Sequence, residues 1–186
     1  MFNPRWSRRA FLRASLLTVL AMSGGQLAWA REMLDNGMPV GRLALYNTHT
    51  DERTEVVYRD RSGEYDLGAL EEINWLLRCH YNDEVREIDI RTIEYLNLLD
   101  RKLGGENEIH VISAYRSPAY NDMLRRNGSG VAKNSLHLEG RAIDIRIPGV
   151  KLSALRRAAL NLEYGGVGYY PRSQFVHLDS GQFRTW

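Results

Sequence analysis

The segment Arg141 to Ile147 constrains the fold of this chain more than any other feature of its sequence. Its three isoleucines recur at every second position, which predicts a β-strand with one apolar face against a core. Asp144 lies on the opposite face of the same strand. Because burying an unpaired carboxylate is costly, Asp144 requires a partner. Arg141 or Arg146 is the ordinary partner, and a metal ion is the alternative.

A histidine precedes this strand at a distance that requires a bend. His137 lies seven residues before Asp144, and on one straight strand that odd spacing would direct the two side chains to opposite faces. Glu139-Gly140 supplies a turn between them. We therefore expect the two side chains to converge from the two sides of that bend.

A second histidine lies on the last strand expected from the alternation. In Phe175 to Asp179, Val176 and Leu178 face one side, whereas His177 and Asp179 share the other. Two histidine nitrogens and one carboxylate oxygen, with a fourth position left to water, match a catalytic zinc site. The spacing alone leaves an equally simple explanation open, which is a buried network of salt bridges.

The remaining pattern predicts a single α+β domain. Apolar residues recur at helical or strand spacing along the chain, with the helices mostly early and an antiparallel sheet late. The expected strands cover 43–46, 54–59, 108–114, 141–147, 165–170 and 175–179, and the expected helices cover 66–79, 89–103, 117–127 and 153–162.

The amino terminus predicts a cleaved export signal at residues 1–30. A basic region precedes an apolar stretch from Ala14 to about Gly25, and Ala28-Trp29-Ala30 forms a small-x-small cleavage site. The stretch is shorter than the ~20 residues that span a bilayer, so no stable membrane anchor is expected after cleavage. Ser7-Arg8-Arg9-Ala10-Phe11-Leu12 fits the twin-arginine type, which exports folded proteins, with general export as the alternative.

Cleavage of the signal changes the charge of the chain. Residues 1–30 hold four arginines and no acidic residue, so 21 of the 25 basic residues remain against 23 acidic ones, a net charge of −2. No nucleic-acid partner is expected from this balance. The single cysteine, Cys79, excludes an internal disulfide and a multi-cysteine metal site. We expect a short extension at 31–42 and then one domain at 43–186, which acts as a monomer.

The motifs around the histidines resemble those of peptidoglycan metallopeptidases of the lysostaphin, D-alanyl-D-alanine carboxypeptidase and hedgehog (LAS) type. The motif Ser-x-His-x-x-Gly-x-Ala-x-Asp runs here from Ser135 to Asp144, and the strand histidine His177 follows. A further motif of that group, Ser-x-x-Arg-Ser, places its arginine at Arg116. The closest similarity, to the exported murein endopeptidase K branch, rests on Val131-Ala132-Lys133, Gly165 to Pro171 and Phe175 to Asp179.

This resemblance covers roughly Leu43 to Trp186 and implies a peptidase fold with one Zn²⁺ per chain. The metal site would lie on a central antiparallel sheet with helices packed on one side. Arg116 would bind the oxyanion or a substrate carboxylate, for which a planar guanidinium is suited. The implied metal ligands are His137, Asp144 and His177, and the residues expected at the substrate are Ser135, Tyr115, Asn121 and Tyr170.

At the position where much of this group has its general base, the chain has a different type of residue. In much of the group an acidic residue stands three positions before the last histidine, where this chain has Gln174. A glutamine cannot accept a proton usefully. Asp179 shares the strand face of His177 and is the candidate base. The alternative is that Asp179 orients a metal ligand.

The implied function is that of a zinc-dependent murein endopeptidase in the periplasm, with peptidoglycan as its partner. Such an enzyme hydrolyses amide bonds in peptide cross-links, including links between two diaminopimelate residues, during cell-wall growth. A D-alanyl-D-alanine-type carboxypeptidase that trims stem peptides is one alternative, because a carboxylate-binding arginine serves either reaction. A non-catalytic peptidoglycan-binding protein that retains the zinc scaffold is the other, and Gln174 keeps it open.

Overall fold

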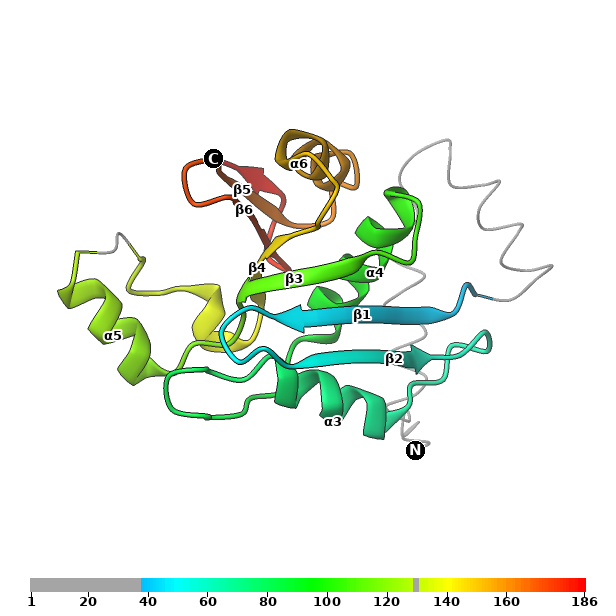
Figure 1. Cartoon of the computed structure of the whole chain (residues 1–186), viewed down its shortest axis with the longest axis horizontal. Coiled ribbons are helices and arrows are strands. Elements are labelled where there is room, and N and C mark those ends of the chain that lie inside the picture. Colours follow the sequence, from blue (N-terminus) through cyan, green and yellow to red (C-terminus); the bar gives the residue numbers. More distant parts are fainter. Residues whose placement is uncertain (1–37, 129–130) are drawn as a thin grey trace, which may run out of the picture.

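One mixed sheet runs through the part of the chain that the structure describes, residues 38–128 and 131–186 of a computed structural model (Figure 1). Its strands are β1 (Gly41–Asn47), β2 (Arg53–Arg59), β3 (Glu108–Ser113), β4 (Ala142–Arg146), β5 (Gly166–Tyr170), β6 (Phe175–Asp179) and β7 (Arg184–Thr185). They lie in the order β2-β1-β3-β4-β6-β5-β7. The export signal predicted at 1–30 falls outside the described residues.

The middle of this sheet is antiparallel, as the resemblance implies. β4 pairs antiparallel with β3 on one side and with β6 on the other, and β6 pairs antiparallel with β5. The pairs β1–β3 and β5–β7 are parallel, so the sheet as a whole is mixed. The predicted α+β fold in a single domain is confirmed, and β4, which carries Asp144, lies at its centre.

Helices cover one face of the sheet. The helical elements are α3 (Leu67–Leu76), α4 (Ile90–Lys102), α5 (Pro118–Arg126), the short 3₁₀ helix η1 (Leu136–Glu139) and α6 (Leu152–Leu160). α3 contacts β2, α4 contacts β1, and α6 contacts β5 and β6 (Figure 1). The isoleucines of β4 are buried in this core. The opposite face of the sheet is therefore left to the polar residues of the strands.

Side-chain caps begin two of the helices, α4 and α5. The Asp89 carboxylate accepts the backbone N–H of Arg91 at the start of α4, and the Ser117 hydroxyl accepts that of Tyr120 at the start of α5. Each cap satisfies a backbone donor that would otherwise lack a partner. The helix predicted at 66–79 ends earlier, at Leu76, because the chain turns back there.

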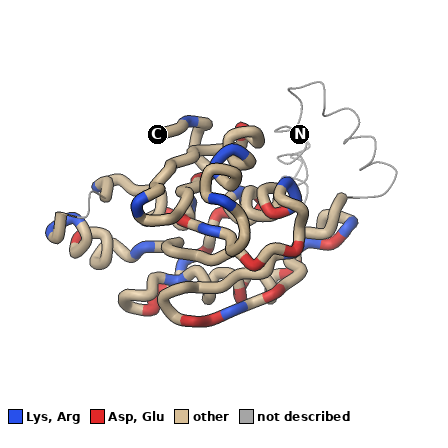
Figure 2. The backbone as a smooth tube through the Cα atoms, turned by 45° about the horizontal axis from the view of Figure 1, so that its top comes forward, with Lys and Arg blue, Asp and Glu red and all other residues tan. Residues whose placement is uncertain are grey.

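The described part of the chain carries charges of both signs over most of its elements. Figure 2 shows acidic and basic positions interspersed along the backbone tube. No helix within 38–128 or 131–186 is both long and apolar enough to span a membrane.

Candidate metal centre

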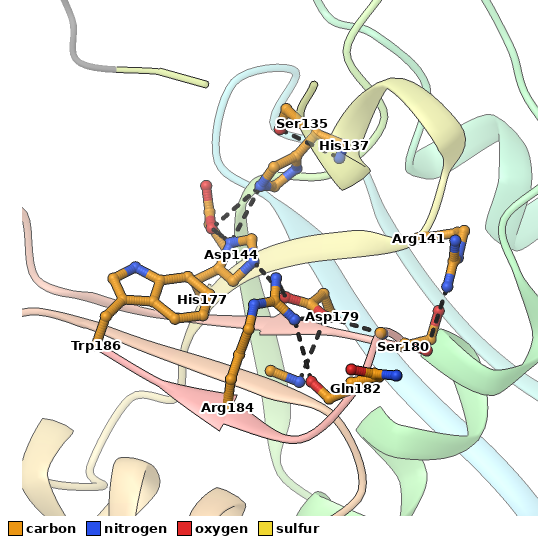
Figure 3. Close-up of polar contacts among 12 residues, drawn as sticks. Ser135, His137, Arg141, Asp144, His177, Asp179, Ser180, Gln182, Arg184 and Trp186 are labelled. Atoms are coloured by element: carbon orange, nitrogen blue, oxygen red, sulfur yellow. Dashed lines mark hydrogen bonds and ion pairs between the residues drawn. The ribbon is translucent and has the colours of Figure 1, made fainter. Parts of the chain in front are cut away.

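Three side chains from three different elements converge on the open face of the sheet. His137 comes from η1, Asp144 from β4 and His177 from β6 (Figure 3). His137 Nε2 lies 3.2 Å from His177 Nδ1, and Asp144 Oδ1 lies 3.4 Å and 2.8 Å from those two nitrogens. All three side chains are largely buried, with exposed fractions of 2%, 6% and 12% in chain order. The structure thus brings together the three predicted ligands.

A bend and a strand pairing produce this convergence. His137 sits in η1, and Gly140 ends that turn with a left-handed backbone at φ 68°. A Cβ at position 140 would lie 2.6 Å from the Glu87 carbonyl oxygen, so only glycine fits there. Asp144 and His177 then face each other as directly paired residues of β4 and β6. The turn predicted at Glu139-Gly140 is confirmed.

Each of the two histidine rings uses one nitrogen to donate a hydrogen bond away from Asp144, which leaves the lone pair of its other nitrogen facing Asp144. His137 Nδ1 lies 2.7 Å from the Ala114 carbonyl oxygen, which accepts its proton. His177 Nε2 lies 3.2 Å from Asp179 Oδ2, which accepts likewise. In the neutral rings the other two nitrogens are therefore acceptors, and both face the carboxylate of Asp144. With both rings in these tautomers, three acceptors point at one another, an arrangement that a bound cation satisfies.

The spacing of these atoms fits a divalent metal. Ligand atoms about 2.0–2.1 Å from a tetrahedral zinc ion lie about 3.3 Å from one another. The three separations here are 3.2, 3.4 and 2.8 Å. The donor set of two imidazoles and one carboxylate is also one that zinc accepts.

The electrostatics of the cluster favour the same interpretation. Burial lowers the pKa of His137, which keeps its ring neutral and able to ligate. Burial opposes ionisation of Asp144, but the interactions with His137 and His177 outweigh burial and lower the pKa of this carboxyl. Burial likewise opposes a charge on His177, yet hydrogen bonds to Asp144 and Asp179 raise its pKa. The cluster therefore favours a positive charge at its centre.

Arg116 is the protein partner of Asp144. Its Nη2 donates to Asp144 Oδ2 at 3.1 Å, and its Nε donates to the Ser113 hydroxyl at 3.0 Å. The ordinary partners expected from the sequence were wrong. Arg141 pairs instead with Asp89 and Glu139, since its side chain lies beyond the end of β4.

Asp179 lies behind His177, on the edge of the ring away from Asp144. The residue is fully buried, and the guanidinium of Arg184 donates to both of its oxygens at 3.0 and 2.8 Å (Figure 3). The backbone N–H groups of Gly166 and Gly181 also donate to it. Burial opposes its charge, but the bonds from His177 and Arg184 lower the pKa of Asp179 to about 2. This carboxylate is ionised and its oxygens are occupied.

Three of the residues expected at the substrate are held by other partners. The Ser135 hydroxyl accepts the backbone N–H of His137 and caps η1. Tyr115 is buried and its hydroxyl donates to Glu84. Asn121 is also buried, and its amide donates to the Ala132 carbonyl oxygen.

Tyr170, the fourth expected substrate residue, is exposed beside the site together with a residue that the sequence analysis missed. The indole of Trp186 lies beside the His177 ring, with ring centres 5.3 Å apart (Figure 3). It donates to the Tyr170 hydroxyl at 2.8 Å. A Cβ at Gly168 would lie 2.8 Å from that indole, so glycine makes room for it. β7, which precedes Trp186, has two residues and is too short to show periodicity.

The fold and the donor set define a single-domain α+β protein with a site suited to a divalent metal ion. Residues 37–186 match the family model of the peptidoglycan L,D-endopeptidase MepK peptidases. The chain is 41% identical over 144 residues to peptidoglycan L,D-endopeptidase MepK of Escherichia coli K12, across 77% of this chain and 79% of that protein. A probable peptidoglycan L,D-endopeptidase MepK of Haemophilus influenzae is 40% identical over 151 residues, across 77% of each chain. The chain therefore belongs to the MepK family of peptidases, and the resemblance to the endopeptidase K branch is confirmed.

Proposed function

We propose that this chain is a zinc-dependent peptidoglycan endopeptidase that hydrolyses amide bonds in peptide cross-links, including those between two diaminopimelate residues. The observation that carries the proposal is the convergence of three buried acceptor atoms, from His137, Asp144 and His177, on one point of the sheet face. Membership of the MepK family supports the substrate class, because the curated relatives are named for that activity.

The proposed cofactor is one Zn²⁺ per chain, held by Nε2 of His137, Nδ1 of His177 and the Asp144 carboxylate. When bound there, zinc would polarise a carbonyl group and lower the pKa of a bound water to near neutrality. The chain's own part is to hold the ligands rigidly. Because the Ala114 carbonyl and Asp179 fix the tautomers of the two rings, their lone pairs stay aimed at the same point.

Arg116 is the proposed electrostatic group at the scissile carbonyl. Two of its five N–H donors are used by Asp144 and Ser113, and its side chain remains 10% exposed beside the ligands. The remaining donors suit a carbonyl oxygen that gains negative charge during attack. The bond to Asp144 also holds that carboxylate in its ligating orientation.

Asp179 is proposed to orient His177 and not to act as the base. Its oxygens accept from His177, from Arg184 and from two backbone N–H groups, and the whole residue is shielded from solvent. A carboxylate with so many donors is a poor proton acceptor at neutral pH. The same contacts fit a group that strengthens a metal-bound imidazole.

The site of action is proposed to be the periplasm, since the substrate of the relatives lies outside the cytoplasm. The twin-arginine signal at 1–30, cleaved before an extension at 31–42 and the peptidase-like domain at 43–186, would supply the route. The mature domain is proposed to act as a monomer, without a stable membrane anchor.

Digestion of purified, cross-linked muropeptides tests this function. With zinc present, the protein is expected to convert dimers into monomers whose masses identify the cleaved amide, and a chelator is expected to stop the reaction. Release of D-alanine from uncross-linked stems would identify a carboxypeptidase instead. If the zinc-loaded protein binds muropeptides but leaves every one intact, it is a non-catalytic binding protein and the proposal fails.

A further inference from the structure

A second row of side chains crosses the open face of the sheet, parallel to the metal ligands. Asp144 and His177 form one row across β4 and β6. Two residues further along β4, Arg146 is on the same face and pairs with His110 of β3, which pairs with Tyr46 of β1. Adjacent residues on one strand face lie about 6.6 Å apart, so Arg146 lies one step from the metal row.

A cavity opens at this second row. It has a volume of about 370 Å³ and is lined by His110, Arg146, Gln174 and the apolar turn after β4. The His110 ring forms a fixed wall, because its Nε2 lies 2.9 Å from Glu108 Oε1 and its edge packs on Tyr46 with ring centres 4.7 Å apart. One wall of the cavity is therefore a side chain held by two contacts.

Arg146 is the only lining residue with a formal charge, and its charge is not compensated locally. Its side chain makes no hydrogen bond or ion pair with any other residue in 38–128 or 131–186, whereas Arg141 and Arg116 both have acidic partners. Gln174, which also lines the cavity, donates its amide to the Pro171 carbonyl and brings no negative charge to the cation. A guanidinium with free donors in a cavity is suited to bind a carboxylate in a bidentate manner.

We propose that Arg146 anchors a free side-chain carboxylate of the peptide whose backbone carbonyl lies at the metal ligands. The inference rests on the proposed function and deepens it by naming a determinant of substrate recognition. A diaminopimelate residue whose α-carbonyl is the scissile group carries a second carboxylate six bonds away. Six extended bonds span about 7 Å, the length of two residues, which matches the step from Asp144 to Arg146.

Two aromatic residues lie level with Arg146 on the neighbouring strands of the same sheet. Phe175 and Tyr170, paired across β6 and β5, stack with ring centres 4.6 Å apart. The methylene groups that connect the two ends of diaminopimelate are apolar, and such a surface shields them from water. The face thus offers a metal site in one row and, one step along the strands, a cation with an aromatic pair beside it.

Kinetics on a matched pair of substrates test this inference. The pair is one cross-linked muropeptide dimer with its free diaminopimelate carboxylate intact, and the same dimer with that carboxylate converted to the amide. Loss of one charge-assisted contact is expected to lower kcat/KM of the wild-type enzyme about 10- to 100-fold on the amidated dimer. Arg146→Gln is expected to lose the same factor on the free carboxylate and to show no preference between the two dimers.

Two controls separate recognition from folding and from metal binding. Arg157→Gln, at an exposed position of α6 on the helix-covered side, is expected to keep the wild-type preference. Zinc content and the unfolding midpoint of Arg146→Gln are expected to equal those of the wild type, because Arg146 is exposed and contacts no ligand. Arg146→Lys keeps the positive charge but loses the two parallel N–H donors of the guanidinium. We expect it to retain part of the preference for the free carboxylate over the amide.

The outcomes distinguish the inference from the function on which it rests. If the wild-type enzyme cleaves both dimers equally well, or if Arg146→Gln keeps the preference, the inference is wrong while the endopeptidase function holds. If the wild-type enzyme, loaded with zinc, cleaves neither dimer, the proposed function fails and the inference fails with it.

Discussion

Two buried groups of charges lie on opposite faces of the sheet, and they differ in how their atoms are matched. On the helix-covered face, Arg59 and Glu94 pair through two bonds of 2.7 and 3.2 Å, and both side chains are 5% exposed. The Tyr65 hydroxyl donates to the same carboxylate. Each of the three guanidinium nitrogens of Arg59 donates to an acceptor, and opposite charges face each other, so the pair needs no further ion.

The cluster on the open face is not complete in this sense. His137 and Asp144 are about as deeply buried and His177 is 12% exposed, but in the neutral rings the atoms that face one another are all acceptors. Burial and charge are thus shared by both clusters and do not identify a site. The unmatched acceptors do, because the histidine nitrogens and the carboxylate oxygen that face one another are left for a bound cation to satisfy.

The largest expected effect comes from removing a ligand from the unmatched cluster. His177→Ala leaves one imidazole and one carboxylate, so we expect its metal content after dialysis to fall to background and its turnover with it. Elemental analysis of the purified variant measures this. The matched control is His49→Ala, since His49 is exposed and bonds only to the Ile112 carbonyl through its side chain. If His177→Ala keeps its full metal content, His177 is not a ligand, and the open-face cluster is not distinguished from the Arg59–Glu94 pair by metal binding.

The next largest effect comes from breaking the matched pair. Glu94→Ala leaves the buried guanidinium of Arg59 uncompensated, so we expect the free energy of unfolding to fall by about 3–5 kcal/mol. Urea denaturation measures this loss. The double variant Arg59→Met/Glu94→Leu removes both charges and is expected to recover most of the stability. Metal content per folded molecule should stay at the wild-type value, and a parallel loss of metal would show that the clusters are coupled.

The sequence indicated the unmatched cluster better than it indicated the surroundings of that cluster. The alternation around Asp144 and the glycine at 140 are local signals, and both led to the observed geometry. The contact from Arg116 spans 28 positions and depends on the order of strands, which no local pattern contains. Arg184 and Trp186 were missed because β7 is too short to show a period. Local chemistry was thus predictable, whereas contacts set by topology were not.

A smaller effect is expected at the carboxylate behind the cluster. Asp179→Asn keeps the shape but removes the charge that aligns His177, so we expect metal affinity or turnover to fall about 10- to 100-fold. Competition with a chelator of known affinity measures the first and muropeptide kinetics the second. Full metal affinity with turnover lost completely would assign Asp179 to proton transfer, the alternative that the sequence left open.

The smallest effect concerns a histidine outside both clusters. His80 stacks on His49 with ring centres 3.7 Å apart, and burial, together with the positive charges of His49 and Arg116, lowers its pKa from 6.5 to about 4. The unfolded chain therefore takes up the proton first, so this group lowers stability as the pH falls from 6.5 to about 4. His80→Phe keeps an aromatic ring for stacking and cannot titrate. Urea denaturation at pH 7 and at pH 4.5 measures the fall in the free energy of unfolding between the two pH values. Since His80 is only partly buried, we expect this fall to be smaller in the variant than in the wild type by about 1 kcal/mol. Equal losses in the two proteins would contradict the shifted pKa.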